Sequence, residues 1–82
     1  MIKKLMETLN DEELRIVKEG NEKNREKLSQ MTPEQIVQEI TFGLLWDYKN
    51  KIEYEQDPEK RRALEKRKKE LNTKWTKLGI IE

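Results

Sequence analysis

Two cap-then-proline signals constrain the fold of this chain more than any other feature. In the first, Thr32 is placed as an N-cap, Pro33 occupies the first helical position and Gln35 completes a capping box. Asp57 and Pro58 repeat the cap-then-proline pattern. Because proline interrupts a helix interior, the sequence predicts one long helix between the two signals, ending near residue 56, and another helix after the second signal.

The long helix has apolar side chains on two sides. Its broad apolar face consists of Ile36, Val37, Ile40, Leu44, Tyr48 and Ile52. Phe42 and Trp46 point to the opposite side, with the small residue Gly43 beside them. A helix that is apolar on both sides needs two neighbours, so we expect a central helix with Phe42, Gly43 and Trp46 at an oligomer or partner interface. The alternative is that these three residues pack against a helix of the same chain.

The N-terminal third predicts one short helix and the start of another. Apolar residues at helical spacing form one face of the short helix: Ile2, Leu5, Met6 and Leu9. Asn10 and Glu13 then match a capping box, and Leu9 and Leu14 occupy the positions of a hydrophobic staple. Carboxylates in a first helical turn favour the helix dipole, so capping accounts for the acidic residues 11–13.

The polar stretch from residue 18 to residue 27 leaves two possibilities open. The second helix either ends at Gly20 or continues as a solvated helix to Leu28. The last helix is better defined, because its narrow apolar stripe contains Leu64, Leu71, Trp75 and Leu78. Gly79 is placed for the left-handed position after a helix, with Ile80 folding back onto Trp75 in a Schellman motif.

The composition limits the size of the hydrophobic core. Only 33% of the 82 residues are hydrophobic and 43% are charged, and a chain of this length buries a modest apolar area. We therefore expect an all-α fold, a small helical hairpin or bundle of three to four helices in a single domain over residues 1–82. Homo-oligomerisation, with a dimer favoured, would complete the core.

Several function classes lack the residues that they need. The chain has no cysteine, which excludes thiolate catalysis and cysteine-ligated metals. It has no histidine, which removes the commonest general base and the commonest transition-metal ligand. It also lacks a glycine-rich phosphate loop. We therefore expect no enzyme, no cofactor and no metal. The longest apolar run, residues 43–46, is too short to span a bilayer. The N-terminus lacks the apolar core of a secretory signal, which favours the cytoplasm.

The near-zero net charge conceals an asymmetry. Residues 1–57 carry 9 basic and 13 acidic side chains, whereas residues 58–82 carry 9 basic and 4 acidic ones. In the last helix, a line opposite the apolar stripe contains Arg62, Lys66, Lys69 and Thr73. The basic residues that flank this line are Arg61, Arg67, Lys68, Lys74 and Lys77. Such a layout suits a phosphate backbone, so these residues are candidates for nucleic-acid binding. A solvated face or an acidic protein partner would produce the same pattern.

RNA is favoured over sequence-read DNA, because no helix-turn-helix or zipper pattern is present. Trp75 and Tyr48 fall on apolar faces and are expected in the core, which leaves Tyr54 as an aromatic residue free to stack on a base. The alternative function is a protein-interaction module, an inhibitor or adaptor of a host protein or toxin. In its short, Lys- and Glu-rich, helical character the chain resembles the small early proteins of large tailed phages. That resemblance rests on no motif and implies no site residues.

Overall fold

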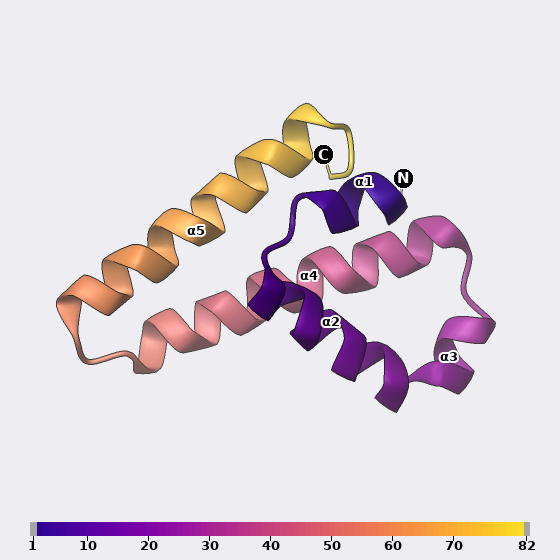
Figure 1. Cartoon of the computed structure of the whole chain (residues 1–82), viewed down its shortest axis with the longest axis horizontal. Coiled ribbons are helices and arrows are strands. Elements are labelled where there is room, and N and C mark those ends of the chain that lie inside the picture. Colours follow the sequence, from indigo (N-terminus) through magenta and orange to yellow (C-terminus); the bar gives the residue numbers. More distant parts are fainter. Residues whose placement is uncertain (1, 82) are drawn as a thin grey trace.

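The computed structural model describes residues 2–81, which form five helices and no strands (Figure 1). The helices are α1 (Ile2–Glu7), α2 (Asp11–Lys23), α3 (Arg25–Ser29), α4 (Pro33–Tyr54) and α5 (Pro58–Lys77). The predicted all-helical class is confirmed, with five helices where three to four were expected. Met1, the first residue of the predicted N-terminal helix, lies outside the described residues.

The predicted capping residues begin the helices as expected. The Thr32 hydroxyl accepts a hydrogen bond from the Gln35 amide at 3.2 Å, and the Thr32 amide donates to Gln35 Oε1 at 3.0 Å. Asn10 and Glu13 form the same reciprocal box, with both bonds at 2.9 Å. Asp57 Oδ1 accepts a hydrogen bond from the Glu59 amide at 2.9 Å. Local side-chain chemistry therefore sets the first residue of α2, α4 and α5.

The polar stretch follows neither of the two predicted courses. α2 continues through Gly20 to Lys23, and the helix is then interrupted at Asn24. The Asn24 side-chain amide donates to the Gly20 carbonyl at 3.0 Å, and its backbone amide donates to the same oxygen at 3.1 Å. Asparagine competes with the backbone in this way and favours helix ends. α3 follows as a separate short helix with no buried residue.

α4 and α5 form an antiparallel hairpin that opens away from the turn joining them (Figure 1). α1 lies at the open end, between the start of α4 and the end of α5, and α2 crosses α4 (Figure 1). The core at this junction consists of Leu5, Leu9, Val17, Val37, Ile40, Leu44, Tyr48, Leu71, Trp75 and Ile80. α4 is therefore the central helix, as predicted, because it contributes side chains to contacts with α1, α2 and α5.

Two leucines predicted to contribute to packing are largely exposed. Leu14 keeps 37% of its surface and Leu78 keeps 46%. Leu14 lines an open hollow together with Met6 and Val17, and Leu78 is the C-cap residue that follows α5. Ile52 of the predicted broad face is half-buried, since α4 extends past α1 and α2 at this end.

The predicted C-terminal Schellman motif is confirmed. Gly79 has a φ of 72°, in the left-handed region. The Ile80 amide donates to the Trp75 carbonyl at 2.8 Å, and the Gly79 amide donates to the Thr76 carbonyl at 3.2 Å. Ile80 and Trp75 are both buried, so the motif returns the chain to the core after the last helix.

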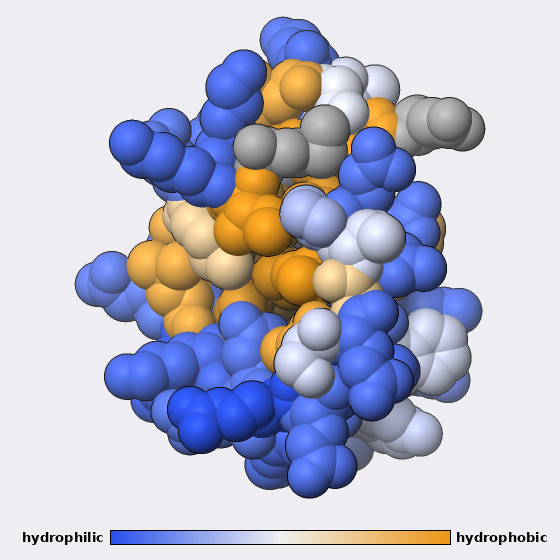
Figure 2. Space-filling model, turned by 90° about the vertical axis from the view of Figure 1, so that its right-hand side faces the viewer, coloured by the Kyte–Doolittle hydropathy of each residue, from blue (hydrophilic) through white to orange (hydrophobic). Residues whose placement is uncertain are grey.

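The small core leaves apolar atoms at the surface. Figure 2 shows the end of the molecule at which α1, α3 and the start of α4 lie. Apolar side chains gather at the centre of this face, and hydrophilic side chains surround them. None of the helices within residues 2–81 is both long and apolar enough to cross a membrane.

Candidate nucleic-acid interface and aromatic surface

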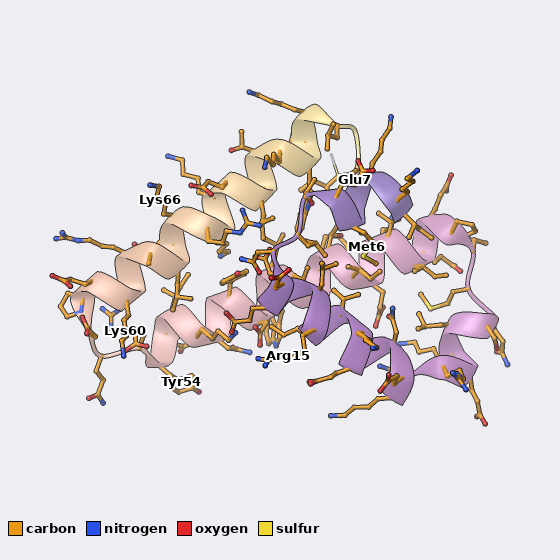
Figure 3. All side chains as sticks on the ribbon, in the orientation of Figure 1. Met6, Glu7, Arg15, Tyr54, Lys60 and Lys66 are labelled. Carbon is orange, nitrogen blue, oxygen red and sulfur yellow. The ribbon has the colours of Figure 1, made fainter. Side chains whose placement is uncertain are left out.

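The outer side of α5 carries the predicted basic line. The line consists of Arg62, Lys66, Lys69 and Thr73, and the flanking Lys77 continues it by one turn. We call these five residues the outer basic face, and all five are exposed. On the opposite side of the helix, Leu71 and Trp75 are buried. Figure 3 shows Lys66 pointing away from the other helices. Packing of the apolar stripe therefore determines the orientation of α5 and turns these residues to solvent.

The cations of the outer basic face have no carboxylate partner. No ion pair within residues 2–81 involves any of them, whereas Lys27, Lys51 and Arg67 each lie within ion-pairing distance of a carboxylate. No carboxylate of the described part of the chain therefore neutralises the cations of the outer basic face.

Two of the predicted nucleic-acid-binding residues have structural contacts instead. The Arg61 guanidinium donates to the Glu55 carbonyl from Nε at 3.1 Å and from Nη2 at 2.5 Å. It therefore satisfies a carbonyl at the end of α4. Lys68 is half-buried, in a hollow that Leu45 and Ile52 of α4 also line. Both residues lie beside the interhelix contact and not on the outer basic face.

A buried ion pair joins α2 to α5, and the sequence did not predict it: Arg67, expected to flank the basic line, turns inward to Glu13. Glu13 is fully buried, and its carboxylate accepts hydrogen bonds from Arg67 Nη2 at 2.6 Å and Arg67 Nε at 2.9 Å. The Tyr48 hydroxyl donates to Glu13 Oε2 at 2.5 Å. Glu13 is thus more than a capping residue, because its carboxylate satisfies donors from α4 and α5 as well as its own helix start.

Thr8 extends this network towards the N-terminus. The Arg67 guanidinium also donates to the Thr8 carbonyl at 2.9 Å. The Trp75 indole N–H donates to the Thr8 hydroxyl at 2.9 Å. We call Thr8, Glu13, Tyr48, Arg67 and Trp75 the core polar cluster. Its members come from α2, α4, α5 and the segment before α2, so the cluster fixes how these parts meet.

The core polar cluster shifts the pKa values of its members. Burial raises the pKa of Glu13, but hydrogen bonds from Arg67, Tyr48 and the Asn10 amide outweigh it and leave the pKa below 4.5. Burial and the neighbouring Glu13 carboxylate raise the pKa of the Tyr48 phenol above 10.0. The hydrogen bonds to Glu13 raise the pKa of Arg67. These shifts favour a charged carboxylate, a charged guanidinium and a neutral phenol at neutral pH, so the charges within the cluster balance.

The predicted aromatic surface is exposed. Phe42 and Trp46 keep 61% and 62% of their surface, so neither is covered by α1 or α2. A side chain added at Gly43 would meet no atom within 4 Å. The Lys49 ammonium lies 5.3 Å from the centre of the Trp46 ring, within range of a cation–π contact. The alternative that these residues pack within the chain is therefore wrong.

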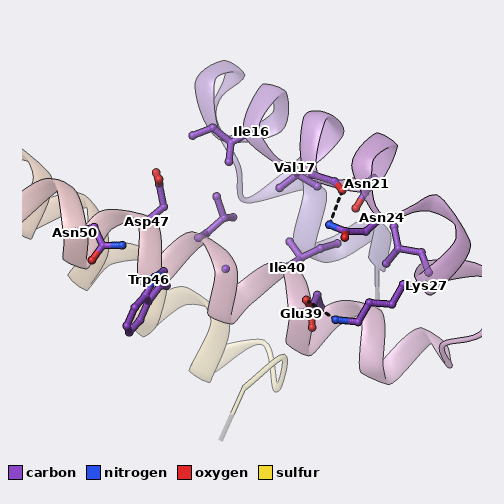
Figure 4. A pocket seen from close by; sticks show the side chains of 14 residues that line it. Ile16, Val17, Asn21, Asn24, Lys27, Glu39, Ile40, Trp46, Asp47 and Asn50 are labelled. Carbon is purple, nitrogen blue, oxygen red and sulfur yellow. Dashed lines mark hydrogen bonds and ion pairs between the residues drawn. The ribbon is translucent and has the colours of Figure 1, made fainter.

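A groove of about 290 Å³ separates α2 and α3 from α4 (Figure 4). Ile16 and Val17 form one wall, and Ile40 forms the floor. At one end, Lys27 and Glu39 form an ion pair at 3.5 Å. Trp46 lies at the other end, on the side of α4 turned away from α2 (Figure 4). The groove is thus adjacent to the aromatic surface.

Comparison of the chain with protein-family models, with curated proteins and with solved structures yields no match.

The core polar cluster had a signal in the sequence. Arg67 lies three residues after Leu64 and four before Leu71, which places it on the apolar stripe and not on the basic line. Lys68 lies four residues after Leu64 and three before Leu71, so it also falls on this stripe. A cation at the spacing of a core stripe indicates either a buried partner or a stem that covers apolar surface. Its partner, 54 positions earlier, could not be chosen without the tertiary fold.

Proposed function

We propose that the protein binds RNA through the outer basic face of α5, by electrostatic contact and without catalysis. One observation carries the proposal: Arg62, Lys66 and Lys69 are aligned and exposed, and no carboxylate within residues 2–81 pairs with them. Cations in such a row displace counterions from a phosphate backbone, which provides affinity without reading the bases.

The aromatic residues favour binding with little sequence preference. Trp75 is fully buried and cannot stack on a base. Tyr54 is 79% exposed, but it lies with Lys60 near the turn between α4 and α5, away from Lys66 (Figure 3). The exposed surface of α5 itself contains no aromatic residue. We therefore expect phosphate contacts to dominate the binding free energy.

The test is titration of a fluorescent single-stranded RNA across a salt series, with duplex DNA alongside. The variant Arg62→Gln/Lys66→Gln/Lys69→Gln should lose most of the affinity. If all three residues contact phosphates, the slope of log K against log salt should become shallower by about 2, because each contact contributes about 0.7 on single strands.

A matched control removes the same charge elsewhere. Arg15→Gln/Lys18→Gln/Lys23→Gln changes three exposed cations of α2 and lowers the net charge equally. Equal losses in the two triple variants would mean that net charge, and not the outer basic face, determines binding. Unchanged affinity in the α5 triple variant would refute the proposal.

The second candidate function is a protein-interaction module, an inhibitor or adaptor that uses Phe42 and Trp46. The 61% and 62% exposure of these side chains favours it, because exposed aromatic pairs are frequent anchors of interfaces. Under this hypothesis Trp46→Ala abolishes capture of a specific, identified partner while RNA affinity is unchanged. Loss of self-association alone would argue against a foreign partner.

A further inference from the structure

One line of α4 is exposed along its whole length. It contains Gln35, Glu39, Phe42, Trp46, Lys49 and Glu53, which we call the outer seam, and every member is exposed. The members alternate in steps of four and three residues, the spacing that follows one face of a helix and forms the seam of paired helices. The core contacts of α4 use a different face, on which Val37, Leu44 and Tyr48 are buried.

The centre of the outer seam is apolar and its ends are polar. Phe42 and Trp46 occupy the two middle positions, with 61% and 62% of their surface exposed. Gly43 lies beside them with open space above its Cα, so a second helix can approach the backbone closely there. An apolar centre with a polar rim is the arrangement of a specific protein interface.

The outer seam is complementary to itself when two copies run antiparallel. With a two-fold axis that crosses the seam at the level of Leu44, midway between positions 42 and 46, Phe42 faces Trp46 of the partner subunit. In the same register Glu39 faces Lys49 of the partner subunit, and Gln35 faces Glu53 of the partner subunit. Each contact occurs twice, as a two-fold interface requires. The seam thus contributes two aromatic pairs, two ion pairs and two amide–carboxylate pairs in one register.

The parallel arrangement is not complementary. There, Glu39, Lys49 and Glu53 would each face the same residue of the partner subunit, and like charges directly opposite one another are unfavourable. Binding of a foreign partner would not require the two halves of the seam to be complementary to each other, as they are about the level of Leu44. We propose that the protein forms an antiparallel, two-fold symmetric homodimer through the outer seam of α4. This proposal does not rest on RNA binding by α5.

Sedimentation equilibrium over micromolar to millimolar concentration tests the proposal. The wild-type chain should show a monomer–dimer equilibrium, and Phe42→Ser/Trp46→Ser should raise the dimer dissociation constant by about 100-fold or more, since central aromatic anchors dominate such interfaces. Tyr54→Ser is the matched control, because it removes a 79% exposed aromatic of the same helix outside the seam. Circular dichroism checks that each variant keeps its helical content.

A charge swap tests the register. Glu39→Lys and Lys49→Glu should each weaken the dimer by placing like charges opposite one another, and the double variant should restore it. Glu39 also pairs with Lys27 of its own chain at 3.5 Å, so Lys27→Gln serves as the control for that contact. Residues 39 and 49 are too far apart along one helix to meet, so restoration requires a second copy.

A wild-type chain that stays monomeric at millimolar concentration would overturn the proposal, as would a serine double variant that dimerises as tightly as wild type. A charge-swap double variant weaker than both single variants would refute the antiparallel register. The RNA-binding triple variant of α5 should dimerise like wild type, so failure of either proposal can be recognised independently of the other.

Discussion

At the scale of single residues, Arg67 is the side chain whose loss should destabilise the fold most. It neutralises the Glu13 carboxylate, which has no exposed surface, although 22% of the Arg67 side chain is exposed. Breaking a buried ion pair costs about 3–5 kcal/mol, because the remaining charge is left in a dry site. We expect Arg67→Met to lower the free energy of unfolding by about 3 kcal/mol, near the lower end of that range, as measured by urea denaturation at neutral pH.

The neighbouring Lys66→Met provides the control for this prediction. Lys66 is exposed on the outer basic face, and its loss should change the free energy of unfolding by less than about 0.5 kcal/mol. Adding Glu13→Gln to Arg67→Met should recover part of the loss, because a neutral amide no longer needs the guanidinium. A double variant as unstable as the sum of the two single changes would contradict the coupling.

The pKa shifts of the core polar cluster predict two limits of stability with pH. The pKa of Glu13 is lowered on folding, so its contribution is present above about pH 4.5 and is lost as the pH falls below that value. The pKa of Tyr48 is raised, so its contribution is present below about pH 10 and is lost as the pH rises further. The urea midpoint should therefore fall less at acid pH in Glu13→Gln than in wild type, and less at alkaline pH in Tyr48→Phe than in wild type. An unchanged profile in either variant would contradict the assignment.

At the scale of the helix, local signals were predictable and long-range ones were not. Thr32, Asn10 and Asp57 cap helices through residues two or three positions away, so their role could be recognised in the sequence. The contact of Glu13 with Arg67 spans 54 positions and depends on how α2 crosses α4. The interruption at Asn24 was missed because asparagine is tolerated in helices and only the side-chain bond to Gly20 shows that it ends one.

For the aromatic surface too, the sequence predicted the helix face but not what covers it. The sequence placed Phe42 and Trp46 on the side of α4 opposite the broad apolar face, and this is confirmed. Whether a helix of the same chain covers them depends on the paths of α1 and α2. Both helices pack on the other face of α4, so the two aromatics stay exposed.

Two glycine substitutions should have opposite effects because their helical positions differ. Gly79 follows α5 with a φ of 72°, so Gly79→Ala should lower the free energy of unfolding by about 1 kcal/mol. Gly20 lies within α2, where alanine is the better helix former, so Gly20→Ala should raise it by about 0.5 kcal/mol. A Cβ would meet no atom within 4 Å at either site. Chemical denaturation of both variants checks the two signs, and equal signs would refute the backbone explanation.

At the scale of the whole molecule, α4 organises everything else. One of its faces forms the core with α1, α2 and α5, while the outer seam faces solvent. α5 in turn uses one side against α4 and presents the outer basic face on the other. The two candidate surfaces therefore lie on different helices, and each can be altered without removing core contacts.

This arrangement predicts an uneven distribution of stability. α3 has no buried residue. Its ion pair with α4 joins Lys27 to Glu39 at 3.5 Å, and these two side chains are 62% and 53% exposed. Its backbone amides should exchange with solvent through local opening that costs little free energy. The amides around Leu44 and Leu71, both buried, should exchange only when the whole chain unfolds.

Hydrogen–deuterium exchange with mass spectrometry measures this difference directly. Peptides covering residues 24–31 should exchange many times faster than peptides covering residues 37–48, at a protein concentration low enough to keep the chain monomeric. The Arg67→Met variant should speed exchange in α4 and α5 towards that of α3, because it lowers the free energy of global unfolding and leaves the local opening of α3 unchanged. Protection of α3 equal to that of α4 would mean that residues 24–31 are covered by contacts that the isolated chain does not have.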